Sequence, residues 1–223
     1  MKMYNLDGSE GKMCGNGIRC VGKFLYDHGM VDINEKDEIT IETLSGIKKL
    51  KAYTSGGKVN RLRVDMGKAI LDPKEIPVAL DGDKVVDRPV EIAGKNYNIT
   101  CVSMGNPHCV VFMDDIDNLD IETIGPEFEN DKLFPERVNT EFVTVLDDHT
   151  IKMRVWERGS GETWACGTGA CAVAVAACEN GFCKKGEDIK IKLKGGDLII
   201  NYTDETVYMT GNAEKVFEGE VEV

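Results

Sequence analysis

The sequence lacks several features that would place it in a specialised class of protein. It has no block of five or more basic residues, and its formal net charge is −12 at pH 7. Nucleic-acid binding depends on cationic side chains that neutralise phosphates, so a nucleic-acid partner is excluded. No apolar run approaches the roughly 20 residues of a membrane helix, and Met1–Asn5 has no signal-peptide core. We therefore expect a cytoplasmic protein with no membrane partner.

The eight cysteines lack the spacing of a metal site. No Cys-x-x-Cys pair occurs, so a structural zinc site is not expected. With 223 residues, 42% of them hydrophobic, the chain can build one large or two small domains without disulfide staples. We expect reduced thiols, and Cys20, Cys171, Cys178 and Cys183 fit core packing.

Hydrophobic periodicity predicts a chain that mixes helices and strands. Apolar residues at helical spacing predict helices over 15–28, 121–130 and 169–179. Alternating or short apolar runs predict strands over 38–42, 47–53, 62–66, 98–103, 109–112, 138–145, 151–157, 189–193, 198–202 and 207–209.

A Cys-Gly-x-Gly motif occurs twice, beginning at Cys14 and at Cys166, and each copy leads into a predicted helix. Free backbone N–H groups and the positive end of the helix dipole favour an anion at such a position. We therefore expect each thiol to have a lowered pKa and to be reactive. One copy could simply be a turn that caps a helix, but two copies in matched settings indicate a shared chemical role.

The order of elements also repeats: strand, loop, Cys-Gly-x-Gly, helix, then a run of antiparallel strands. This pattern indicates an internal duplication into two similar domains. No Pro-rich or Gly/Ser-rich linker separates the halves, so we place the boundary in a turn near Gly56-Gly57. We assign 1–58 with 212–223 to the N-terminal half and 59–211 to the C-terminal half. A cleft between the halves is the expected place for both cysteines.

Two opposed thiols suit a racemase or epimerase that acts on an amino acid. Such an enzyme removes the α-hydrogen from one face and returns a proton to the other; a thiolate abstracts, a thiol donates, and the roles swap in reverse. Backbone N–H groups at the helix N-termini would hold the substrate carboxylate. The sequence shows no Gly-rich phosphate cradle coupled to a lysine for pyridoxal phosphate, so we expect a mechanism without cofactor.

Four segments, in order along the whole chain, carry a family resemblance. They are Asn5–Glu10 (NLDGSE) with Met13–Cys20 (MCGNGIRC), Ser103–His108 (SMGNPH), Arg137–Phe142 (RVNTEF), and Glu157–Thr163 (ERGSGET) with Ala165–Gly169 (ACGTG). With these segments, the chain resembles the diaminopimelate epimerase family. The resemblance implies cofactor-independent interconversion of LL- and meso-diaminopimelate, a precursor of lysine and peptidoglycan, by a homodimer.

The resemblance also implies a fold and a set of site residues. The fold is α/β (α+β), with two pseudo-symmetric domains, each a mostly antiparallel sheet wrapped around a central helix, and the active site in the cleft between them. Cys14 and Cys166 would be the acid/base pair, with His108 and Glu157 assisting them. The substrate would be bound by the backbones of Gly15, Asn16, Gly167 and Thr168 and by the side chains of Asn5, Asn106, Asn139, Glu157 and Arg158.

Some of these residues have simpler explanations when taken alone. Asn106 before Pro107 fits a turn, and His108 fits a half-buried histidine. The guanidinium of Arg158 offers a planar fork suited to a carboxylate, although a solvated surface arginine would look the same. Members of the family begin with a further strand and a Gly-Asn loop, and this sequence starts downstream of them. We therefore expect the 223-residue chain to have impaired or no activity.

Two alternatives stay open at this stage. A related cofactor-independent racemase with another amino-acid substrate is less favoured, because Asn5, Asn106, Asn139 and Arg158 are all present. From another class, the chain could be an inactive remnant or a thiol redox protein that links Cys14 to Cys166. The substitution Cys14→Ser separates these, since a redox protein loses its disulfide whereas an epimerase loses proton exchange.

Overall fold

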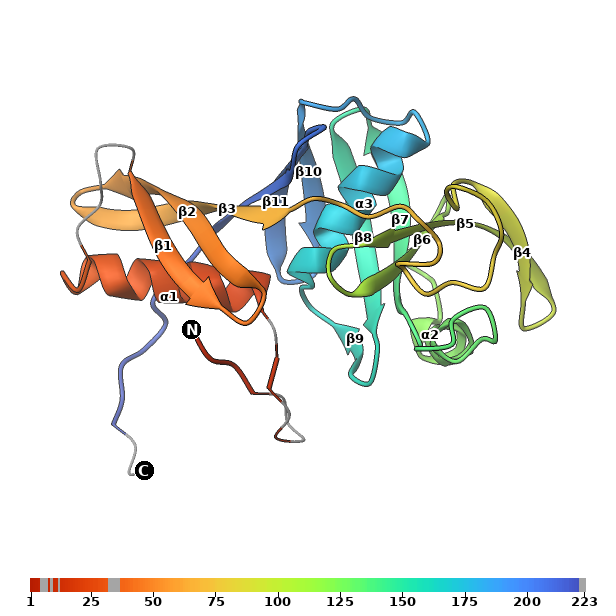
Figure 1. Cartoon of the computed structure of the whole chain (residues 1–223), viewed down its shortest axis with the longest axis horizontal. Coiled ribbons are helices and arrows are strands. Elements are labelled where there is room, and N and C mark those ends of the chain that lie inside the picture. Colours follow the sequence, from red (N-terminus) through yellow and green to blue (C-terminus); the bar gives the residue numbers. More distant parts are fainter. Residues whose placement is uncertain (5–7, 9, 12, 32–36, 221–223) are drawn as a thin grey trace. The chain divides into compact units, whose positions relative to one another are not determined.

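The computed structural model describes residues 1–4, 8, 10–11, 13–31 and 37–220 of the chain. These fold into two compact units (Figure 1). Unit 1 consists of Met1–Val64 and Thr210–Val223, and unit 2 of Asp65–Met209. The chain leaves unit 1 within β3 (Lys58–Gly67) and returns to it within β12 (Val207–Asn212).

Unit 1 packs one helix, α1 (Gly15–Asp27), against the antiparallel strands β1 (Glu38–Thr43), β2 (Gly46–Ser55) and β3. The buried residues of α1 are Gly15, Ile18, Arg19 and Gly22, at the spacing of one helix face. Gly22 permits close packing, since a Cβ there would lie 2.7 Å and 2.9 Å from methyl carbons of Leu62 and Leu50. α1 is therefore an amphipathic helix seated on a small sheet.

Unit 2 is built on one long sheet. From its end in β12 the strand order is β11 (Gly196–Tyr202), β10 (Asp188–Leu193), β8 (Thr150–Glu157), β7 (Asn139–Asp147), β6 (Pro107–Phe112), β5 (Lys95–Ser103) and β4 (Arg88–Ile92), with β9 (Gly161–Thr163) paired to β8. Two neighbouring pairs, β6 with β7 and β8 with β10, are parallel. Parallel neighbours need crossover connections, and α2 (Ile121–Glu129) and α3 (Gly167–Glu179) lie in these two connections.

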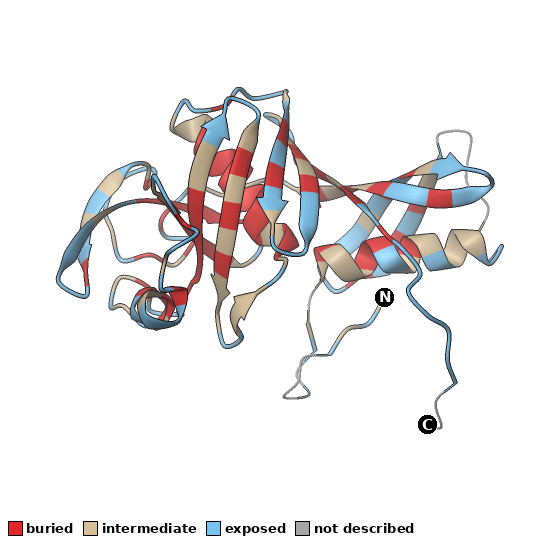
Figure 2. Ribbon diagram, turned by 180° about the vertical axis from the view of Figure 1, so that it is seen from behind, coloured by how far each residue is buried: buried red, intermediate tan, exposed pale blue. Residues whose placement is uncertain are grey.

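The helix α3 forms the centre of unit 2. It packs on β5, β6, β7, β10 and β11, and every residue from Gly169 to Ala177 is buried. Figure 2 shows α3 as a continuous buried segment behind strands whose buried and exposed residues alternate. Alanine and valine fill most of the helix, because small side chains let it approach the sheet closely. A second core, with Phe128 and Phe142 edge to face at 5.3 Å, lies under α2.

The predicted mixed class of fold is confirmed. Every predicted helix and strand is present, with ends displaced by a few residues; α3, for example, begins at Gly167 rather than at 169. Two strands were not predicted, β4 and β9. In each unit a Cys-capped helix is followed by three strands, β1–β3 after α1 and β10–β12 after α3. No helix in the described part of the chain is long and apolar enough to cross a membrane.

Candidate active site

Both cysteines are the N-caps of their helices, as predicted. Cys14 has an extended backbone, and its Sγ accepts a hydrogen bond from the Gly17 N–H at 3.3 Å. Cys166 has the same conformation, and its Sγ accepts from the Gly169 N–H at 3.3 Å. Each sulfur therefore occupies the position that a capping oxygen usually takes, with one free backbone donor pointing at it.

The surroundings of the two sulfurs differ. Cys14 is half-buried, whereas Cys166 is only 5% exposed. Burial, together with the carboxylates of Glu157 and Glu141, raises the pKa of Cys166 well above its ordinary value, and hydrogen bonds from Thr168 and Gly169 oppose this only in part. The prediction of a lowered thiol pKa is therefore wrong for Cys166, because desolvation and two carboxylates outweigh the helix terminus.

Three of the predicted site residues of unit 2 lie at one end of three neighbouring strands. His108, at the start of β6, is in register with Asn139, at the start of the parallel strand β7. β8 runs antiparallel to β7 and ends at Glu157, so that this residue reaches the same end of the sheet. The topology thus gathers segments that are far apart in sequence.

Hydrogen bonds connect three of these residues to Cys166. The His108 Nε2 lies 3.1 Å from the Asn106 Oδ1, and the Asn106 Nδ2 donates to the Thr168 Oγ1 at 3.3 Å. The Thr168 Oγ1 lies 3.5 Å from the Cys166 Sγ. Asn106 therefore does more than begin a turn, and the fully buried His108 is tied to the cysteine through it.

Asn139 and Arg158 are held to each other and to the backbone. The Asn139 Nδ2 donates to the Pro107 carbonyl at 2.8 Å, and its Oδ1 accepts from the Arg158 N–H at 3.0 Å. The Arg158 guanidinium donates to the Glu136 carbonyl at 2.8 Å. The Glu157 carboxylate accepts a hydrogen bond from the Thr163 hydroxyl. This arrangement fixes the turn after β8 on which Glu157 and Arg158 lie.

Glu141, on β7, was missed as a separate residue by the sequence interpretation. Its side chain is fully buried, and its Oε1 lies 2.7 Å from the His108 Nδ1. Burial raises the pKa of Glu141, although His108 opposes the shift. The sequence does place Glu141 as a charged residue inside the predicted strand 138–145. The structure shows that 139–143 of this strand are buried.

In unit 1 the first turn of α1 is fixed by a buried arginine. The Arg19 Nη1 donates to the Gly15 carbonyl at 3.1 Å, and its Nε donates to the Asn212 carbonyl of β12 at 3.3 Å. This pairing holds the predicted carboxylate-binding backbone of Gly15 and Asn16 in place. Asn5, also predicted to bind substrate, lies outside the residues that the structure describes.

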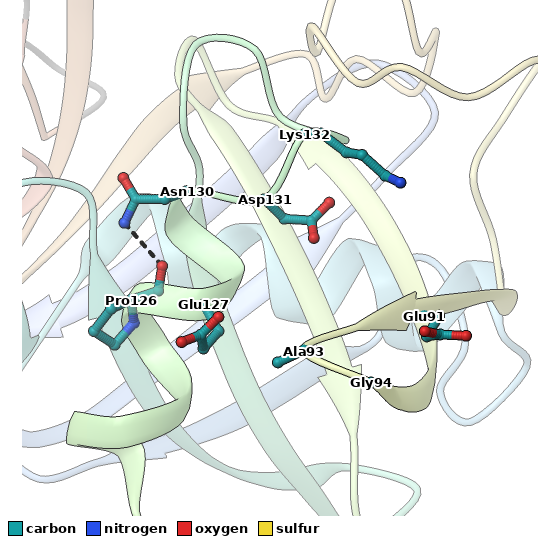
Figure 3. Close-up of a pocket in the computed structure, with 8 residues that line it drawn as sticks. All are labelled: Glu91, Ala93, Gly94, Pro126, Glu127, Asn130, Asp131 and Lys132. Atoms are coloured by element: carbon teal, nitrogen blue, oxygen red, sulfur yellow. Dashed lines mark hydrogen bonds between the residues drawn. The ribbon is translucent and has the colours of Figure 1, made fainter.

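A cavity of about 560 Å³ lies elsewhere in unit 2, between the β4–β5 turn and the end of α2 (Figure 3). Its lining residues are Glu91, Ala93, Gly94, Pro126, Glu127, Asn130, Asp131 and Lys132. Asn130 is engaged with the Pro126 carbonyl at 2.8 Å. None of these lining residues belongs to the predicted site, so the cavity is separate from the chemistry around Cys166.

Solved structures with the same fold include a probable racemase and an epimerase of amino acids. A probable proline racemase from Agrobacterium radiobacter matches with a TM-score of 0.72 and 15% identity, covering 95% of this chain and 68% of that one. A hydroxyproline epimerase from Agrobacterium vitis matches with a TM-score of 0.71 and 15% identity, covering 95% and 66%. At this identity the likeness establishes the fold.

Sequence comparison defines the family. The diaminopimelate epimerase family model matches residues 1–71 and 100–216. The diaminopimelate epimerase of Acetivibrio thermocellus is 53% identical over 225 residues, which span all of this chain and 79% of that protein. That of Agathobacter rectalis is 51% identical over 232 residues, spanning all of this chain and 80% of that protein. The chain belongs to the diaminopimelate epimerase family, and is thus an isomerase.

Proposed function

We propose that this chain interconverts LL- and meso-diaminopimelate with two cysteines and without a cofactor. The observation that carries the proposal is the matched capping of α1 and α3, in which Cys14 and Cys166 each accept a hydrogen bond from the N–H of the third residue of the helix. Two relatives that align with the whole of this chain at 51–53% identity are diaminopimelate epimerases by name. The cysteines would supply a base for one face of the α-carbon and an acid for the other.

The raised pKa of Cys166 supports one choice of starting roles. A thiol whose pKa is raised by burial and by nearby carboxylates rests in the protonated form. Cys166 therefore serves as the proton donor in one direction, and Cys14 removes the α-hydrogen from the other face; the roles exchange in the reverse reaction. His108 and Glu157 assist the two cysteines in these transfers.

The substrate groups have candidate partners. The backbone N–H groups of the first turns, at Gly15-Asn16 and Gly167-Thr168, would bind the reacting carboxylate, where negative charge develops as the α-hydrogen leaves. The side chains proposed for the other amino and carboxylate groups are Asn5, Asn106, Asn139, Glu157 and Arg158. In the structure Arg158 donates to a backbone carbonyl, and a substrate carboxylate would replace that acceptor with a charged one.

Three further parts of the proposal concern the location, pathway and oligomeric state of the enzyme. We place it in the cytoplasm, in the biosynthesis of lysine, and as a homodimer. Light scattering on the purified, reduced protein tests the last point. A mass of about twice 24.6 kDa supports the dimer, and a mass equal to one chain contradicts it.

Proton exchange in deuterated water tests the reaction. The reduced protein is incubated with LL-diaminopimelate, and NMR follows loss of the α-hydrogen signal and formation of the meso isomer. We expect Cys14→Ser and Cys166→Ser each to slow isomerisation roughly 10²- to 10⁴-fold, the range for loss of a general acid or base. Cys20→Ser, at an exposed cysteine of α1, is the matched control and should keep the parent rate.

The same assay tests a related racemase as the alternative. Hydroxyproline is offered in place of diaminopimelate, because a structural neighbour is a hydroxyproline epimerase. Exchange of its α-hydrogen, with none for diaminopimelate, would replace the proposed substrate. Isomerisation of diaminopimelate that survives both cysteine substitutions would instead overturn the two-cysteine mechanism.

A further inference from the structure

A row of hydrogen bonds runs from a buried carboxylate to the sulfur of Cys166. Glu141 Oε1 lies 2.7 Å from His108 Nδ1, and His108 Nε2 lies 3.1 Å from Asn106 Oδ1. The row continues through Asn106 Nδ2 and Thr168 Oγ1 to Cys166 Sγ, with separations of 3.3 Å and 3.5 Å. All five residues belong to unit 2. The far end of this row, Glu141, has no place in the proposed proton transfers.

The chemistry of the groups gives the row a direction. The Asn106 amide donates from Nδ2 to Thr168 and presents its oxygen to His108, so His108 must carry a hydrogen on Nε2. The Thr168 hydroxyl accepts from Asn106 and keeps its own hydrogen, which it can donate to Cys166 when that sulfur is a thiolate and has no hydrogen to give. In that state every donor in the row points toward the sulfur, and the Gly169 N–H adds a second donor there.

The other end of the row explains why His108 can keep that hydrogen. With Nε2 protonated, the 2.7 Å contact between Nδ1 and Glu141 shares one more proton. The pair then holds two protons, as imidazolium with carboxylate or as neutral imidazole with carboxylic acid. Both forms have zero net charge, which suits two side chains that are 0% exposed. Without an acid at 141, a neutral histidine could carry its single hydrogen on either nitrogen.

The backbone of α3 is shaped around this carboxylate. A Cβ at Gly169 would lie 2.5 Å from Glu141 Oε1 and 3.2 Å from its carboxyl carbon. The Glu141 Oε2 is buried and has no hydrogen-bond partner among the described residues. A buried carboxylate with one orphaned oxygen is costly, so its retention against the first turn of α3 calls for a role.

We propose that Glu141 is a positioning residue for Cys166: it fixes a hydrogen on His108 Nε2, which orients Asn106 and through it the Thr168 hydroxyl toward the sulfur. The inference rests on the proposed function, in which Cys166 gives up a proton during the reaction. The sulfur then becomes a thiolate, which accepts from the Gly169 N–H and from the Thr168 hydroxyl. Glu157 and Glu141 both act on this sulfur by charge, and Glu141 alone also acts through the row.

The position of the hydrogen on His108 is directly measurable. Long-range ¹H–¹⁵N NMR of the imidazoles distinguishes protonated from unprotonated ring nitrogens, and the chain has three histidines. His28→Gln and His149→Gln, both outside the row, assign the His108 signals by elimination. We expect a protonated Nε2 in the parent protein. An unprotonated Nε2 would mean that the Asn106 amide is reversed, and would overturn the proposal.

Substitutions at 141 separate positioning from packing. Glu141→Gln can donate from its amide to Nδ1, so we expect it to retain the hydrogen on Nε2. Glu141→Leu fills similar space without a partner for Nδ1, and the His108 signals should then show both tautomers. Glu129→Leu removes another buried carboxylate, one that accepts from Trp156 and Gly159 instead, and should leave the His108 tautomer unchanged.

A double-substitution cycle tests whether Glu141 acts through Thr168. The readout is the rate of Cys166 alkylation by iodoacetamide across pH, resolved by peptide mass spectrometry. Thr168→Val removes the last donor and should lower this rate roughly 3- to 10-fold, the range of one hydrogen bond. Because Glu141→Gln and Glu141→Leu remove the same charge, they should differ in this rate when Thr168 is present and differ little in the Thr168→Val background, whereas independent effects would multiply. Multiplying effects would reduce Glu141 to a structural residue.

These readouts need no substrate. If diaminopimelate is not isomerised while the tautomer and the alkylation cycle behave as expected, the proposed substrate fails and the positioning role stands. If isomerisation occurs and the tautomer is wrong, the positioning role fails alone. Glu141→Gln and Glu141→Leu both remove a charge that helps to raise the pKa of Cys166, so their comparison isolates the row. Cys166 should be alkylated faster in Glu141→Gln than in Glu141→Leu, which a purely structural defect would not predict.

Discussion

The helices α1 and α3 start in the same way and are embedded differently. Each has 13 residues and a cysteine N-cap whose sulfur accepts a hydrogen bond from the third residue of the helix. α1 buries four residues along one face, whereas α3 is buried from Gly169 to Ala177. The sulfur at the buried helix has a strongly raised pKa despite its capping donors. A helix terminus alone therefore does not decide the state of a thiol; the depth of burial and nearby carboxylates do.

The largest difference in stability between matched substitutions in the two helices should appear at the tenth residue of each helix. Ala176 of α3 is fully buried, and Phe24 of α1 is 51% exposed. Ala176→Lys would bury an unpaired charge and should cost at least about 4 kcal/mol. Phe24→Lys should cost about 1 kcal/mol or less. Soluble yield and thermal unfolding measure both, and a stable Ala176→Lys protein would contradict the described packing of α3.

The glycine that donates to each sulfur offers the next comparison. Gly169→Ala places a Cβ 2.5 Å from Glu141 Oε1, so we expect a loss of about 1–3 kcal/mol in the free energy of unfolding. At Gly17 the nearest atom to a Cβ is the flexible end of the Met1 side chain, at 3.3 Å. Gly17→Ala should therefore be nearly neutral. Chemical denaturation checks both, and equal costs would show that the glycines serve only the turns.

Thiol alkylation extends the comparison to reactivity. The thiolate fraction falls tenfold for each unit by which the pKa rises, and Cys166 is both shifted upward and 5% exposed. We expect iodoacetamide to modify Cys14 roughly 10-fold faster or more at pH 7–8, measured by peptide mass spectrometry. The Cys166 rate should keep rising with pH through that window, because its thiol titrates above it. A plateau for Cys166 near neutral pH would contradict the raised pKa.

The smallest expected effect on stability concerns the last residue of each helix, which is acidic. Burial acts to raise the pKa of Asp27. Hydrogen bonds from Lys23 and from the Val59 N–H lower this pKa by more than burial raises it, so the net shift is downward. Burial likewise acts to raise the pKa of Glu179, and Lys84 leads the groups that lower it overall. Each ionised group therefore stabilises the fold above its unfolded pKa of about 4, and this is lost as pH falls through the lower folded value.

We expect Asp27→Asn and Glu179→Gln each to reduce stability by about 1 kcal/mol at pH 7. The difference from the parent protein should shrink below about pH 4, where the parent carboxyls also become protonated. Thermal unfolding across pH 3–7 measures this. A constant difference over the whole range would show that the ion pairs are not its source.

Local patterns in the sequence predict most elements of the fold, because helix spacing, strand alternation and Gly-rich turns are local signals. β4 escaped prediction because Pro89 interrupts its pattern; β4 ends the sheet, where proline is tolerated. β9 has only three residues and begins with Gly161, so no periodicity could reveal it. Both missed strands gain their structure from the neighbours with which they pair.

The candidate site was predictable where it depends on sequence neighbours and not where it depends on tertiary packing. The capping role of Cys166 follows from its motif, but its pKa depends on burial by segments distant in the chain. Glu141 and His108 are separated by 33 residues and meet because β6 and β7 pair in parallel register. The sequence interpretation did not predict that pairing, so Glu141 stayed unrecognised.

The two crossings of the chain between the units have a consequence for biosynthesis. Unit 2 is continuous from Asp65 to Met209, whereas unit 1 joins its first 64 residues to a segment that begins at Thr210. The last residues of unit 2 are synthesised only just before Thr210–Asn212, which complete β12 in unit 1. Arg19 of α1 must wait for the carbonyl of Asn212. We therefore expect the half that holds Cys14 to mature only after the ribosome has passed Asn212.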